Sequence, residues 1–246
     1  MGVTSFKEWL HVIDADSEDF TKEKDQLYRL TCDGYDCFNG INSADLTWRL
    51  GRAAYKVAAA ADASGNREKW KKYVTESEQV LRRAIQLDDT VPESYSSLAV
   101  VLGKKTATAS VRDKVSLGKE IRELLDKAIT LGASDHQTYY AYGRWCYEVA
   151  SLTWSERKVA LLLFGVPLES SFTDALAMFH MVEPLRPFWS SNNYWIARTA
   201  VKLKDFAKVK EYAQKAALIG SHDEEDVMHE QGITALLNKY SNSQPQ

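Results

Sequence analysis

Cysteine, proline and glycine are all scarce in this sequence. Its 246 residues contain three cysteines, five prolines and twelve glycines. Cys32, Cys37 and Cys146 are odd in number and show no CxxC spacing, which argues against a disulfide framework and against a zinc site. We expect buried, reduced thiols. With few helix breakers and few runs of β-branched residues, the composition predicts an all-helical protein.

Long hydrophobic runs are also missing. The longest one, at residues 159–164, is far too short to span a bilayer. The first residues, MGVTSFKEWL, lack the apolar core of a signal peptide. We therefore expect a cytoplasmic protein without a membrane anchor.

The sequence has no recognisable catalytic motif. Its five histidines are scattered without an HExxH pattern, and no GxxxxGK[ST] or GxGxxG run is present to hold a phosphate group. We expect no enzyme activity, no cofactor and no metal. The 31 basic and 34 acidic side chains give a net charge of −3, which argues against general nucleic-acid binding. Local charge is uneven: residues 104–122 are basic, whereas residues 14–19 and 223–226 are acidic.

One pattern of large and small residues occurs four times along the chain. Each copy contains a large residue followed by Gly or Ala, at Leu50-Gly51, Leu98-Ala99, Tyr142-Gly143 and Ile196-Ala197. A second helical stretch follows each copy, at residues 77–84, 121–128, 175–182 and 209–216. Two antiparallel helices need a small residue where they cross, and this is the tetratricopeptide pattern. The sequence predicts an all-α, tetratricopeptide-like α-solenoid of about four helical hairpins.

The repeats are longer than the standard unit. Their anchors lie 48, 44 and 54 residues apart, against a usual period of about 34. We expect a break at residues 64–66, a polar loop at 104–110 and an extra helix at 155–164. We divide the chain into a short N-terminal helix and linker (1–23), the helical array (24–220), and a capping helix with a frayed tail (221–246). Ser221 is the expected cap of that last helix, whose predicted apolar face is Val227, Ile233, Leu237 and Tyr240.

The first helices of such an array line its concave surface. At the positions expected to be exposed there, an aromatic residue followed four residues later by Arg recurs in three helices. Residues four apart share a helix face, so ring and guanidinium can stack. The sequence predicts a basic and aromatic groove for an acidic peptide, because arginine grips carboxylates while rings pack against the rest of the chain. Its predicted residues are Trp48, Arg52, Tyr55, Lys56, Lys104, Tyr140, Arg144, Tyr147, Tyr194, Arg198 and Lys202.

Two other interpretations of these residues remain open. The arginines can cover their own helices while Trp48 and the tyrosines pack between repeats. Alternatively, an N-terminal or inserted helix of the same chain fills the groove. We also interpret Cys146 as a small core residue, and the apolar run at residues 160–164 as a buried helix face.

Several segments resemble the regulator of microtubule dynamics proteins. They are WRLGRA at 48–53, YGRWCYEVA at 142–150, WSERKVA at 154–160 and LFGVP at 163–167, together with the end of the array from Asn193 to KLKD at 202–205. The resemblance covers roughly residues 25–218. It implies a tetratricopeptide-like helical fold without enzymatic activity, which associates with microtubules or the spindle in the cytoplasm. Some members carry an N-terminal membrane anchor, and lipid binding by the helical domain is reported within the family.

These two lines of inference suggest a partner. Tubulin presents acidic, disordered tails, which suit a basic and aromatic groove. We expect Arg52, Arg144 and Arg198 to contact such a tail in a monomeric protein. The alternatives are an adaptor for another acidic peptide, such as that of a mitotic regulatory protein, and a phospholipid-binding helical module.

Overall fold

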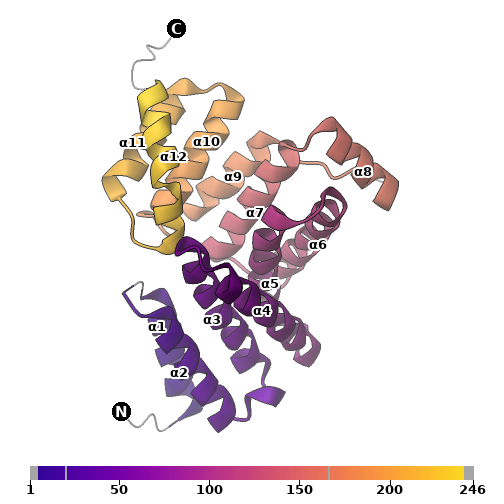
Figure 1. The fold of residues 1–246 in the computed structure, drawn as a ribbon, viewed down its shortest axis with the longest axis vertical. Coiled ribbons are helices and arrows are strands. Elements are labelled where there is room, and N and C mark those ends of the chain that lie inside the picture. Colours follow the sequence, from indigo (N-terminus) through magenta and orange to yellow (C-terminus); the bar gives the residue numbers. More distant parts are fainter. Residues whose placement is uncertain (1–4, 20, 166, 241–246) are drawn as a thin grey trace. The chain divides into compact units, whose positions relative to one another are not determined.

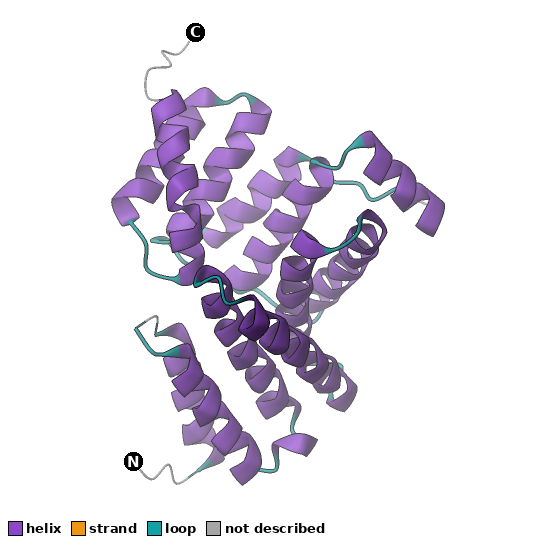
Figure 2. Ribbon diagram, viewed as in Figure 1, coloured by secondary structure: helices purple, strands orange, loops and turns teal. Residues whose placement is uncertain are grey.

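A computed structural model describes residues 5–19, 21–165 and 167–240 of the chain. Within these ranges the chain forms twelve α-helices and two short 3-10 helices, and no strand (Figure 1, Figure 2). The α-helices are α1 (Phe6–Glu18), α2 (Lys24–Cys37), α3 (Ala44–Ala63), α4 (Arg67–Leu87), α5 (Pro92–Lys105), α6 (Val111–Thr130), α7 (His136–Ala150), α8 (Trp154–Phe164), α9 (Phe172–Val182), α10 (Ser190–Leu203), α11 (Phe206–Ile219) and α12 (Glu224–Tyr240).

The chain divides into two compact units. The first contains residues 1–102 and 126–133, and the second contains residues 103–125 and 134–246. In the first unit α2 packs against α3, and α3 against α4. In the second, α7 pairs with α9, α10 pairs with α11, and α12 packs on both α10 and α11. The all-α, tetratricopeptide-like fold class is thus confirmed.

Polar side chains determine where several of these helices begin. Ser43 accepts a hydrogen bond from the backbone N–H of Leu46 at the start of α3, and Asn66 caps α4 in the same way. Thr153 and Ser171 each form a capping box, at the starts of α8 and α9. Such caps satisfy backbone donors that the first helical turn leaves unpaired. The sequence therefore encodes many helix starts locally.

Glycines stand where paired helices come closest. A Cβ atom added to Gly51 of α3 would lie 2.5 Å from Leu81 of α4, and one added to Gly143 of α7 would lie 2.7 Å from Phe179 of α9. Leu81 and Phe179 are both fully buried. The predicted role of the small residue in the repeat is confirmed at these two crossings.

The insertions in the repeats are accommodated in different ways. The break at residues 64–66 and the extra helix α8 are confirmed. The predicted loop at residues 104–110 is wrong at its start, because α5 continues to Lys105 and a 3-10 helix spans Thr106–Thr108. Alternating Thr and Ala residues can extend a helix end by one tighter turn.

The C-terminal helix differs from the prediction at its start. Asp223, and not Ser221, accepts a hydrogen bond from the backbone N–H of Asp226 in the first turn of α12. Ile233 and Tyr240 are buried as predicted, but Val227 is 54% exposed and does not belong to the apolar face. The predicted frayed tail at residues 241–246 lies outside the described residues.

We predict that Gly143→Ala lowers the free energy of unfolding by about 1–3 kcal/mol, because the new methyl group would overlap the fully buried ring of Phe179. Urea denaturation measures the change. Gly103→Ala is the matched control: nothing lies within 4 Å of an added Cβ atom there, so the better helix propensity of alanine should stabilise by up to about 1 kcal/mol. Equal effects of the two substitutions would contradict the packing explanation.

Candidate functional site

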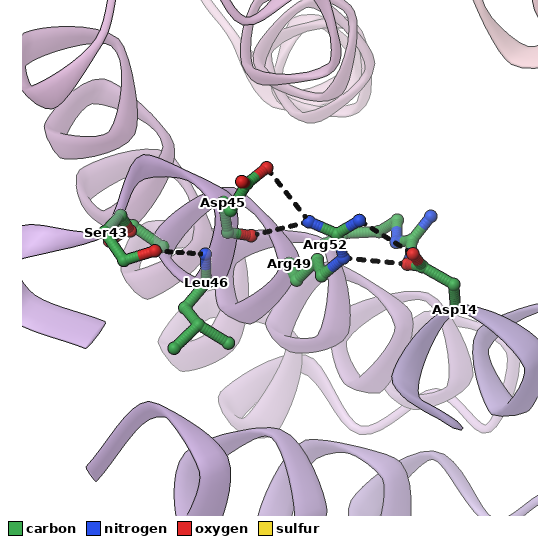
Figure 3. A network of polar contacts seen from close by, with 7 residues as sticks. Asp14, Ser43, Asp45, Leu46, Arg49 and Arg52 are labelled. Carbon is green, nitrogen blue, oxygen red and sulfur yellow. Dashed lines mark hydrogen bonds and ion pairs between the residues drawn. The ribbon is translucent and has the colours of Figure 1, made fainter. Parts of the chain in front are cut away.

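The predicted arginine of α3 holds a carboxylate from α1. Arg49 donates to Asp14 through Nε at 2.9 Å and Nη2 at 2.7 Å, and Arg52 donates through Nη2 at 2.7 Å (Figure 3). Burial would raise the pKa of Asp14, but the two guanidinium groups hold it below its usual value. Lys56 donates to the backbone carbonyl of Ser17. The acidic N-terminal helix therefore lies on the basic face of α3.

The ring of Trp48 packs against the two arginines that bind Asp14. The guanidinium groups of Arg49 and Arg52 lie 4.3 and 4.6 Å from the centre of its ring. Trp48 is only 5% exposed, so little of its ring is open to solvent. Tyr55, one turn further on, is half-buried. Stacking on an aromatic face fixes an arginine side chain and leaves its N–H edges available to a carboxylate.

In the second unit, the predicted arginine of α7 holds a carboxylate from α12. Arg144 donates from Nη1 to Oε1 of Glu225 at 2.9 Å, and the Tyr140 hydroxyl donates to the same oxygen at 3.1 Å. Lys104 Nζ lies 3.5 Å from the other oxygen, Oε2. The Arg144 guanidinium also lies 3.9 Å from the centre of the Trp195 ring. One carboxylate thus joins three of the predicted groove residues.

Glu225 is ionised in this setting. Burial would raise the pKa of its carboxyl, but the positive charges of Lys104 and Arg144 hold that pKa well below its usual range. The side chain is 21% exposed, so water screens the interaction only in part. Burial and the nearby Glu225 charge raise the pKa of the Tyr140 hydroxyl, which therefore stays a hydrogen-bond donor.

The neighbouring acidic side chains of the same turn are also bound. Asp223 accepts hydrogen bonds from Arg186 and from the indole of Trp189, both at 3.1 Å. Asp226 is fully buried and accepts from the backbone N–H and the hydroxyl of Ser191 at 2.7 and 2.6 Å. The first turn of α12 is therefore anchored through three carboxylates.

Arg198 and Lys202 of α10 differ from the other predicted cations. Arg198 lies over three rings, with 4.6 Å to the centre of Trp195 and 5.3 Å to that of Tyr147; the third, Tyr194, is at 5.6 Å. Lys202 lies 5.7 Å from the centre of Phe172. In the part of the chain that the structure describes, neither cation has a carboxylate within ion-pair distance. Together with Tyr147, Phe172 and Trp195 they define what we call the α10 surface.

The prediction that the aromatic groove residues are exposed to solvent is wrong. Trp48, Tyr140, Tyr147 and Tyr194 are 4–8% exposed, whereas the repeat rule predicted exposed positions. Regular repeats leave these positions open, but here Arg49 and Arg52 lie over Trp48, and Gly232 of α12 packs on Tyr194. The three predicted arginines do lie beside predicted rings: Arg52 beside Trp48, Arg144 beside Tyr140 and Arg198 beside Tyr194.

Sequence reasoning missed the carboxylates that complete these clusters. Asp14, Asp223 and Glu225 belong to the acidic stretches noted above, and Arg49, Arg186 and Trp195 are further members of the clusters. The available signal was charge complementarity between two acidic stretches, one near each end of the sequence, and the predicted basic groove. Pairing them required knowing which helices become neighbours.

Three further expectations can be compared with the structure. Cys146 is buried, as predicted, but Cys32 is only half-buried and Cys37 is exposed, so the expectation of buried thiols is wrong for these two. The run at residues 160–164 is not a buried face, because Leu161 is 51% and Leu162 is 84% exposed, with only Ala160 fully buried. Among the described residues, no helix combines the length and apolarity needed to cross a bilayer, and no group of three potential His, Cys, Asp or Glu ligands occurs.

We predict that Glu225→Gln lowers the free energy of unfolding by about 1–3 kcal/mol near pH 7, because the arginine and lysine lose their charged partner. The folded-state pKa of Glu225 lies below its unfolded value. Its stabilising contribution is therefore complete above the ordinary carboxyl pKa and disappears as pH falls through the lowered one. Urea unfolding at a series of pH values should show wild type and variant converging in acid.

Glu169→Gln is the control for that experiment, because it removes the same charge from an exposed position. A constant difference between wild type and Glu225→Gln across the whole pH range would contradict ionic anchoring of α12.

Comparison with known proteins places the chain in a family. The family model described as Regulator of microtubule dynamics protein 1-3 matches residues 9–241. Regulator of microtubule dynamics protein 1 of Bos taurus is 30% identical over 89% of this chain and 68% of its own length. Regulator of microtubule dynamics protein 3 of Xenopus laevis is 28% identical over 74% of this chain, which corresponds to 39% of the relative.

Two solved structures are similar at a greater distance. The MamA protein gives a TM-score of 0.45 at 14% identity and covers 98% of this chain and 100% of its own. YrrB, described as a TPR protein with an unusual peptide-binding site, gives 0.43 at 14% identity and covers 91% of each chain. The family match, which extends over nearly the whole described chain, is the informative result. The chain belongs to the regulator of microtubule dynamics protein family.

Proposed function

We propose that this chain is a non-enzymatic, microtubule-related scaffold whose α10 surface binds an acidic peptide, such as a tubulin tail. The observation that carries the proposal is the state of Arg198 and Lys202. Both cations lie over aromatic rings, and neither is paired with a carboxylate in the described part of the chain. Family membership supports the microtubule context.

The chemistry of the neighbouring cluster supports an acidic ligand. Arg144 lies against Trp195 and binds a carboxylate, and Arg198 lies against the same ring. A guanidinium held on an aromatic face presents its N–H groups in a fixed plane, which favours hydrogen bonds to a carboxylate. An incoming glutamate would therefore meet, at Arg198, an environment like that of Glu225 at Arg144.

Two predicted groove residues of the same unit, Lys104 and Arg144, join the site when Glu225 of α12 leaves them. In the other unit, Arg52 and Lys56 bind Asp14 and Ser17 at α1. We propose the cytoplasm, and the spindle during mitosis, as the place of action, with the protein acting as a monomer. Binding should be micromolar and salt-sensitive, because partly exposed charges contribute more to encounter than to affinity.

A second candidate is an adaptor for the acidic peptide of another protein, such as a mitotic regulatory protein. The same side chains would serve it. Competition between tubulin-tail peptide and the other peptide for the purified protein separates the two functions. A tubulin tail that fails to compete would favour the adaptor.

We predict that the double variant Arg198→Glu/Lys202→Glu loses at least about tenfold in affinity for taxol-stabilised microtubules in co-sedimentation, since it repels the carboxylates it should attract. Its melting temperature should fall only by what the lost ring contacts of the two cations contribute, because neither cation has an ion pair to lose in the described part of the chain. Removing the acidic tails from the microtubules should reduce wild-type binding to the same level.

Lys210→Glu/Lys239→Glu is the matched control, because it makes the same charge change at two exposed lysines of α11 and α12. Equal sedimentation of the Arg198/Lys202 variant and the wild type would rule out the α10 surface as the microtubule site.

A further inference from the structure

The first turn of α12 has the composition of an acidic ligand. Residues 223–226 read Asp-Glu-Glu-Asp. Asp223 and Glu225 each contact an arginine and an aromatic hydrogen-bond donor, namely Arg186 with Trp189 and Arg144 with Tyr140. This is the recognition that a basic and aromatic groove offers to an acidic peptide. Here the peptide is part of the same chain.

The occupied and unoccupied arginines share one aromatic wall. Arg144 lies 3.9 Å and Arg198 lies 4.6 Å from the centre of the Trp195 ring. The carboxylate of Glu225 therefore ends beside the α10 surface. A longer acidic segment that binds Arg198 would reach Arg144 only where Glu225 now lies.

We infer that residues 223–226 are an internal competitor for the acidic-peptide site, so that a full-length acidic partner must displace the first turn of α12. The inference rests on the proposed function, since it concerns how access to that same site is regulated. As a consequence, residues 223–226 lower the affinity of the protein for an acidic partner.

The hold of Glu225 on Arg144 is incomplete. Glu225 accepts a hydrogen bond from Nη1 of Arg144, whereas Nε of the same guanidinium is buried and has no hydrogen-bond partner among the described residues. In the first unit, Arg49 uses both Nε and Nη2 on Asp14. The Nε–H and one Nη2–H lie on the same edge of a guanidinium, so a peptide carboxylate can use that edge of Arg144, whereas Glu225 is bound at Nη1 and does not use Nε.

The first turn can leave while the rest of α12 stays attached. Gly220 precedes it with a φ of 74°, a conformation open to glycine, and Ser221 and His222 are exposed. Further along the helix, Ile233 and Tyr240 are buried against the unit. Displacement of residues 223–226 therefore opens one end of the helix and also releases the buried Asp226 from Ser191.

The test uses the full chain and a fluorescein-labelled oligoglutamate peptide, with binding measured by fluorescence anisotropy. Glu225→Gln should raise peptide affinity about tenfold over wild type, because the internal carboxylate no longer competes. Glu169→Gln removes the same charge elsewhere and should bind like the wild type. Equal affinity of Glu225→Gln and wild type would overturn the inference.

A second measurement needs no variant. Hydrogen exchange of the wild-type protein should show faster exchange in residues 223–229 when the peptide is bound, whereas unchanged or slower exchange would overturn displacement.

The outcomes of these experiments also separate the further inference from the proposed function. Peptide binding that depends on Arg198 and Lys202 but not on Glu225 leaves the proposed function standing without the competitor, and no binding by any variant rejects both.

Discussion

The contact of the Arg144 guanidinium with the Trp195 ring on one side and the Glu225 carboxylate on the other organises the second unit. It joins α7, α10 and α12 at one point. The ring fixes the plane of the guanidinium, and the guanidinium with Lys104 keeps the carboxylate ionised although it is largely buried. Without that carboxylate, two cations would face each other across a poorly hydrated space, and the first turn of α12 would lose its anchor.

The first unit uses the same chemistry with different partners. Arg49 and Arg52 lie against Trp48 and hold Asp14 of α1. In both units, then, a terminal helix supplies the acid and a repeat helix supplies the ring and the arginine. A face built to stack arginine on aromatic rings attracts carboxylates from any source. Arg198 and Lys202 have no carboxylate within ion-pair distance among the described residues, and they are therefore the candidates for the external ligand proposed above.

Local signals were sufficient for most of the fold. The small residues Gly51 and Gly143, which permit close helix crossings, and the caps at Ser43, Thr153 and Ser171 are all visible in the sequence, and each acts within one turn or one hairpin. The extra helix α8 could be predicted for the same reason. The helical end of α5 could not, because polar Thr and Ala residues are compatible with both a loop and a helix end.

The candidate site was predictable only in part. The four-residue spacing of ring and arginine identified residues that do stack, such as Tyr140 with Arg144 and Tyr194 with Arg198. The carboxylate partners lie 38 residues from Arg52 and 81 from Arg144 along the chain. The periodicity of the sequence cannot predict contacts between such distant residues, because these contacts depend on how the terminal helices pack. The burial of Trp48 and the tyrosines follows from that same packing.

The most direct test of this account is a double-mutant cycle of Arg144→Met and Glu225→Gln, with the free energy of unfolding measured by urea denaturation near pH 7. Because the two groups touch in a partly buried setting, the account predicts that the effects of the single substitutions do not add, with a coupling energy of about 1–3 kcal/mol. Additive effects, with no coupling beyond about 0.5 kcal/mol, would contradict it.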